Sequence, residues 1–96
     1  MYRDDPLDDE FELRELVGDE AVDRLEEAAE SLPQDLIGVA VDVLRVLQGW
    51  VDDERAAGWF HQPQRRLEGR RPIDALAAGA VEEVVDAASA WAAAQG

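Results

Sequence analysis

Residues 35–48 read DLIGVAVDVLRVLQ, and this stretch decides the fold. Nine of its fourteen residues are apolar, and the polar positions Gly38, Asp42, Arg45 and Gln48 leave only a narrow stripe. A helix that is apolar on nearly every side must be covered by neighbours from several directions. The valines alone would suit a strand, but the length of the stretch and the spacing of its charged residues favour a helix. We therefore expect a buried central helix.

The segments on either side of this stretch are also predicted to be helical, because glycine, proline and acidic capping residues divide them at helix-like lengths. No window alternates polar and apolar residues over the length of a strand. The expected helices are 8–17, ended by Gly18; 20–31, capped by Asp19; 54–62, capped by Asp52 or Asp53 and closed by Pro63; 73–78, opened by Pro72; and 80–94, with a loop at 64–71. The sequence thus predicts an all-α fold, a compact small domain of about five to six helices around a buried central helix.

The charge balance of the chain is strongly acidic. Its 96 residues suit a single domain and carry 23 acidic side chains against nine arginines, for a net charge of −14. Thirteen of the acidic residues precede Ser31. Such a charge repels nucleic-acid phosphates and anionic lipids, so neither DNA binding by this chain alone nor membrane association is expected. The acidity suits either a salty cytoplasm or a basic protein partner.

Residues that carry catalysis or bind metals are sparse. His61 is the single histidine and, with no second histidine or cysteine, is a poor metal ligand. Ser31 and Ser89 lie outside any G-x-S-x-G motif, and the glycines form no nucleotide-binding loop. The sequence predicts a protein that is not an enzyme and has no metal or cofactor. The absence of a signal peptide and of a bilayer-spanning run predicts a cytoplasmic location.

Two features exceed what a small core needs. Arg65, Arg66, Arg70 and Arg71 crowd one loop. They either pair with nearby carboxylates or bind an acidic or phosphate-bearing partner, since guanidinium groups bind such groups bidentately. The candidate carboxylates are Asp52, Asp53, Glu54, Glu68 and Asp74. The second feature is a set of aromatic residues, for which core packing is the default and interface anchoring the alternative. Its members are Trp50, Trp59, Phe60 and Trp91.

Several motifs follow one another in a fixed order. The apolar helix IGVAVDVLRVL (37–47) precedes an acid-capped DERAAGWF (53–60), a proline at 63 and LEGRRPIDAL (67–76), before a glycine at 79 and a final helix. Over some 60 of the 96 residues this ordered set resembles the toxin-binding domain of the MbcA/ParS/Xre antitoxins. The matching single positions are Trp59, Pro63, Leu67, Gly69, Arg71, Pro72 and Leu76.

The resemblance implies the antitoxin of a type II toxin–antitoxin system, whose partner is a RES-domain toxin that degrades NAD. It also implies that the C-terminal part of the antitoxin occludes the NAD pocket of the toxin. We expect the apolar seam of the last helix to be complete by Trp91, so that the tail 92–96 adds little to the core. The residues expected to bind the toxin are Trp59, Arg65, Arg66, Arg70, Arg71, Pro72, Trp91, Gln95 and Gly96.

Members of this family often carry a helix-turn-helix before the toxin-binding domain. Here the expected division is an acidic helical segment at 1–34, too acidic for a DNA-recognition helix, and a toxin-binding domain at 35–96. Two alternatives stay open: a DNA-binding regulator of its own operon, and a generic helical module for protein interaction or oligomerisation. Either alternative, like toxin binding, is compatible with a homo- or hetero-oligomer.

Overall fold

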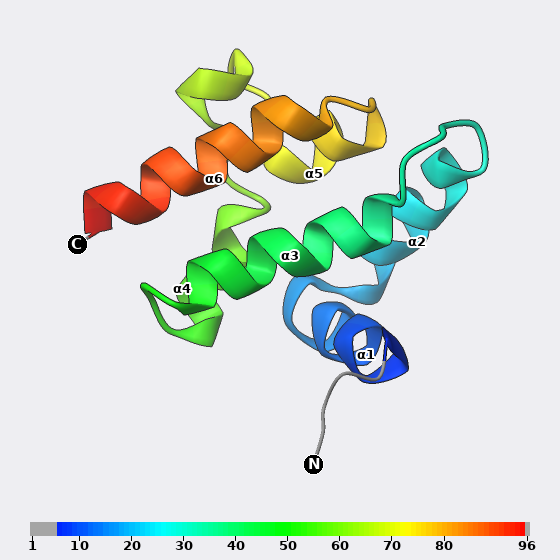
Figure 1. Ribbon diagram of the computed structural model, residues 1–96, viewed down its shortest axis with the longest axis horizontal. Helices are drawn as coiled ribbons and strands as arrows, with labels where there is room; N and C mark the ends of the chain where they lie inside the picture. The colour runs from blue at the N-terminus through cyan, green and yellow to red at the C-terminus, as the bar shows by residue number, and fades with distance from the viewer. Residues whose placement is uncertain (1–5, 96) are drawn as a thin grey trace.

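The computed structural model describes residues 6–95 of the chain. Within them the chain forms six α-helices, one turn of 3-10 helix and no strand, so the all-α prediction is confirmed (Figure 1). The 3-10 turn lies inside the segment predicted to be a loop. The elements are α1 (Pro6–Val17), α2 (Asp19–Ala29), α3 (Leu36–Gln48), α4 (Asp53–Trp59), η1 (Arg65–Leu67), α5 (Pro72–Ala77) and α6 (Val81–Gln95).

Helix α3 occupies the centre of the fold. Leu36, Ala40, Leu44 and Leu47 are fully buried on it, and α1, α2, α4, α5 and α6 all pack against it. This confirms the expected central helix. Its burial is incomplete, however, because the side chain of Val46 is 44% exposed.

The starts of α4 and α2 bear on the expected capping residues. Asp52 caps α4 by accepting a hydrogen bond of 2.9 Å from the backbone N–H of Arg55. The expected cap of α2 at Asp19 is wrong, because Gly18 takes that place and Asp19 is the first helical residue. The chain turns sharply between α1 and α2, and Gly18 has a φ of 114°, which favours glycine.

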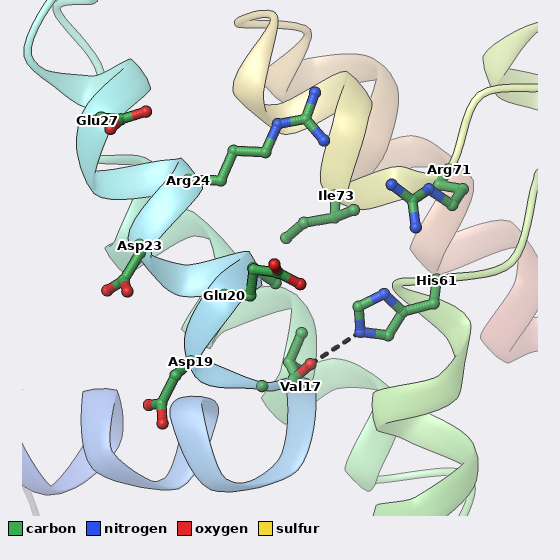
Figure 2. A pocket seen from close by; sticks show the side chains of 11 residues that line it. Val17, Asp19, Glu20, Asp23, Arg24, Glu27, His61, Arg71 and Ile73 are labelled. Atoms are coloured by element: carbon green, nitrogen blue, oxygen red, sulfur yellow. Dashed lines mark hydrogen bonds between the residues drawn. The ribbon is translucent and has the colours of Figure 1, made fainter.

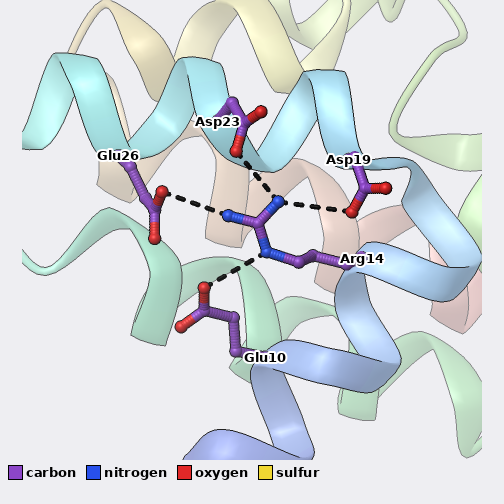
Figure 3. A network of polar contacts seen from close by, with 5 residues as sticks. All are labelled: Glu10, Arg14, Asp19, Asp23 and Glu26. Atoms are coloured by element: carbon purple, nitrogen blue, oxygen red, sulfur yellow. Dashed lines mark hydrogen bonds and ion pairs between the residues drawn. The ribbon is translucent and has the colours of Figure 1, made fainter.

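Helices α1 and α2 are joined by an arginine that meets four carboxylates (Figure 3). The guanidinium of Arg14 lies 2.9 Å from Asp23, 3.1 Å from Glu26 and 3.3 Å from both Glu10 and Asp19. The hydrogen bond to Asp23 contributes most to raising the pKa of Arg14 above its usual value. One cation thus offsets part of the repulsion among the carboxylates of these two helices.

The aromatic residues divide between the core and the surface. Trp59 and Phe60 are fully buried and meet edge to face, with ring centroids 5.7 Å apart, while half-buried Trp91 lies 6.4 Å from Trp59. The indole N–H of Trp59 is buried and has no hydrogen-bond partner among residues 6–95. Core packing is the wrong expectation for Trp50, whose side chain is 55% exposed.

The end of α6 also departs from expectation. Ala92 is only 1% exposed, so the apolar seam continues past Trp91 and the tail does contribute to the core. Beyond it, Ala93 and Ala94 are exposed. The amide of Gln95 donates to the carbonyl oxygen of Trp91 and accepts from the guanidinium of Arg55, both at 3.1 Å.

The helices of residues 6–95 are all too short or too polar to cross a membrane.

The central position of α3 gives a test of stability. We expect Leu44→Ala to lower the free energy of unfolding by about 2–5 kcal/mol, because it removes a fully buried side chain and leaves a cavity. Val46→Ala on the same helix should cost about 0.5 kcal/mol, as a surface change does. Urea unfolding followed by circular dichroism measures both. Equal costs would contradict the placement of α3.

Candidate partner-binding surface

The loop that carries the arginines is held by its own backbone. Two N–H groups, those of Leu67 and Gly69, donate to the carbonyl oxygen of Gln64, and the N–H of Gln64 donates to the carbonyl of Arg70. Leu67 anchors the loop in the core, with 1% of its surface exposed. The short helix η1 packs against α6. The loop is therefore a fixed platform for the side chains that it displays.

Its arginines do not share one environment. Arg65 and Arg66 are exposed, and neither has a carboxylate partner among residues 6–95. Arg70 donates from Nε to the carbonyl oxygen of Leu67 at 3.1 Å, which leaves the two terminal nitrogens of the guanidinium unbonded within this part of the chain. For these three residues, pairing with carboxylates is not what the structure shows.

Arg71, in contrast, forms an ion pair with a nearby carboxylate. Its guanidinium donates to both oxygens of Asp74, at 2.8 and 3.1 Å, and Arg24 from α2 pairs with the same carboxylate. The hydrogen bond from Arg71 contributes most to lowering the pKa of Asp74, with a further contribution from Arg24. Asp74 thus ties α2 to the start of α5.

The unpaired arginines are concentrated in this loop. Eight arginines lie within residues 6–95, and four of them, Arg14, Arg24, Arg45 and Arg71, form ion pairs. Of the other four, Arg55 bonds to Gln95, and the remaining three are on the loop. A chain with a net charge of −14 therefore holds a small surface of uncompensated positive charge beside α6. We call Arg65, Arg66 and Arg70 the arginine platform.

A comparison with protein families assigns the segment that carries this platform. Residues 47–90 match the antitoxin Xre/MbcA/ParS C-terminal toxin-binding domain. We call residues 47–90, which are similar to this family, the toxin-binding domain. No curated protein and no solved structure gives a match to the chain.

The match extends over the end of α3, the whole of α4, η1 and α5, and most of α6. The toxin-binding domain therefore includes the arginine platform. It ends before three of the residues predicted to bind the toxin, Trp91, Gln95 and Gly96, and Gly96 also lies outside the residues that the structure describes.

The aromatic and proline positions predicted to bind the toxin lie mostly beneath the surface of the toxin-binding domain. Trp59 is fully buried and Pro72 is buried, so their side chains support the surface from below. Trp91 is half-buried against Trp59. Sequence reasoning missed Arg55, whose bond to Gln95 holds the end of α6; the 40-residue separation gives no local signal of that contact.

A cleft of about 600 Å³ separates the start of α2 from the toxin-binding domain (Figure 2). Glu20 and Arg24 line it from α2, while His61 and Arg71 line it from the other side. His61 donates from Nε2 to the carbonyl oxygen of Val17 at 2.8 Å and so joins the end of α1 to the end of α4. The cleft mixes both charges, because four carboxylates of α2 line it together with the guanidinium groups of Arg24 and Arg71. Among residues 6–95, no group of three or more metal-binding side chains converges.

The shared carboxylate of Asp74 gives a pH-dependent test. Its folded-state pKa lies below the unfolded value, so its ion pairs stabilise the fold above the ordinary carboxyl pKa of about 3.9 and lose that contribution as pH falls through the folded value. Asp74→Asn should therefore lower stability at pH 7 by about 1 kcal/mol or less. The difference between the two proteins should shrink below about pH 4, measured by urea unfolding across pH. A difference that stays constant down to pH 2 would contradict this role.

Proposed function

We propose that this protein neutralises a RES-domain toxin that degrades NAD, by binding it and blocking its active site. It acts by stoichiometric binding and not by catalysis. The observation that carries the proposal is the arginine platform: the toxin-binding domain of a strongly acidic chain displays three guanidinium groups with no carboxylate partner among residues 6–95. Arginine side chains of this kind bind carboxylates or phosphates of a partner through paired hydrogen bonds.

The platform is suited to binding because its backbone is already ordered. The hydrogen bonds around Gln64 and the buried anchor Leu67 fix the loop before the partner arrives. Less conformational entropy is then lost when the complex forms, and affinity rises accordingly. The platform would meet acidic groups on the rim of the toxin.

The end of α6 is the element that we propose enters the active site. Ala93 and Ala94 are exposed and have small side chains. Gln95 is held in place by hydrogen bonds to Arg55 and to the carbonyl oxygen of Trp91. A pocket that binds the phosphates of NAD is expected to be basic, so an antitoxin of net charge −14 is attracted to it. Docking through the platform and occlusion by the helix end are separable steps.

The docking step is tested by the double substitution Arg65→Ala/Arg66→Ala. We expect it to weaken binding to the cognate RES-domain toxin by about tenfold or more, because each charged hydrogen bond at an interface contributes about 1.5–3 kcal/mol. The control is Arg24→Ala/Arg45→Ala, which removes the same charge from paired arginines elsewhere. Titration calorimetry measures both. If the two double variants lose affinity equally, net charge and not the platform sets the binding.

The occlusion step is tested by a chain that ends at Ala92. This truncation keeps the buried Ala92 and removes the exposed end of α6 together with Gln95. We expect it to unfold near the temperature of the full chain and to bind the toxin, but to leave NAD degradation uninhibited. NAD consumption by the purified complexes is the measurement. Full inhibition by the shortened chain would show that the block comes from another surface.

A further inference from the structure

Large apolar side chains are exposed together on two neighbouring helices. In the part of the chain that the structure describes, four large hydrophobic residues are exposed. Val46 is on α3, Trp50 lies two residues after the end of α3, and Val85 is on α6. The fourth, Phe11, is on α1. The exposed fractions are 44% for Val46, 55% for Trp50 and 41% for Val85. Such a concentration on a small domain indicates a binding surface.

On α3 these residues share the flank that lies beside α6. The opposite flank is marked by Arg45 and Gln48, whose side chains reach Asp9 and Glu12 on α1. The N–H of Trp50 bonds to the carbonyl of Leu47 at 2.9 Å, so the helical turn continues beyond α3. Val39, Val46 and Trp50 then follow one another at intervals of seven and four residues, along one line of the helix.

On α6 the corresponding residues are Val81 and Val85, one turn apart. Helices α3 and α6 pack side by side and run in the same direction (Figure 1). Val84 and Ala88 belong to the buried stripe of α6. Val81 and Val85 lie along one edge of this buried stripe. This edge of α6 is the one nearer to α3. We call Val39, Val46, Trp50, Val81 and Val85 the α3–α6 face.

The edges of the α3–α6 face are acidic. Asp42 is exposed one turn before Val46, and Glu82 and Asp86 are exposed next to Val81 and Val85. The nearest arginine along α3, Arg45, is already paired with Asp9 and Glu12. Two apolar rows with carboxylates on both outer edges call for a partner that is apolar in the middle and basic on its sides.

We propose that the α3–α6 face docks a basic amphipathic helix of a partner protein. Two adjacent helices present paired rows of side chains, between which the apolar stripe of a third helix packs. Lysines and arginines beside that stripe would meet the acidic edges. A second copy of this chain is a poor occupant, since each copy has a net charge of −14 and the same acidic edges. The face lies across α6 from η1 (Figure 1), so this inference goes beyond the proposed use of the arginine platform and does not depend on it.

The probe is a synthetic 14-residue helix with leucines along one side and lysines elsewhere, compared with a scrambled peptide of the same composition. We expect the striped peptide to shift the emission of Trp50 to shorter wavelength and shield it from acrylamide. Trp50→Phe should abolish most of that change, because Trp59 is fully buried and Trp91 is half-buried. Titration calorimetry gives the affinity for both peptides.

Site specificity is tested with Val46→Ser/Val85→Ser, which we expect to weaken binding of the striped peptide about tenfold, because two apolar contacts are lost. Phe11→Ser is the matched control, an exposed apolar residue on another helix, and should leave the affinity unchanged. Circular dichroism checks that both variants are folded. Equal affinity for the striped and scrambled peptides, or equal loss in both variants, would overturn the proposal. A dimer of the free chain that Val46→Ser/Val85→Ser dissociates would place a second copy on the face and overturn it as well.

Discussion

A helix such as α3, with apolar side chains around most of its circumference, is not stable in water until neighbours cover it. Here α1, α2, α4, α5 and α6 all pack against it. Leu13, Val22 and Leu25 of the acidic N-terminal helices belong to the same buried cluster as Leu44 of α3 and Val84 of α6. The many carboxylates of α1 and α2 are tolerated because their apolar sides are needed at the core and Arg14 offsets part of the repulsion outside it.

The same requirement positions the functional surface. The arginine platform is fixed because Leu67 is pulled into the core, and α5 starts where Arg71 can pair with Asp74. Local pairing neutralises Arg71, while Arg65, Arg66 and Arg70 in the same loop form no ion pair among the described residues. The number of loop arginines that can bind a partner is therefore set by the position of Asp74, which pairs with Arg71 and leaves the other three unpaired.

Much of this architecture follows from the sequence, and the misses have physical reasons. The length and composition of 35–48 indicate a central helix, and an aspartate at position 52 before a helical segment indicates its cap. The start of α2 differs from the expected one because the turn at Gly18 depends on how two helices cross. Periodicity places Trp50 on a flank of α3 but does not tell whether another helix covers that flank. The division of arginines into paired and unpaired depends on distances that only the folded chain sets, and the residues proposed to contact the toxin stay predictions.

The shared burial of α3 has a consequence for how such a chain is put together. The matched segment 47–90 begins at the end of α3, so most of that helix and both N-terminal helices that cover it lie outside the recognisable domain. The segment that matches the family is therefore shorter than the segment that forms the hydrophobic core. In a recombination that exchanged what precedes residue 47, the incoming segment would have to bring its own hydrophobic cover for α4 and α6. Modularity in this chain is limited by its hydrophobic core and not by its binding surface.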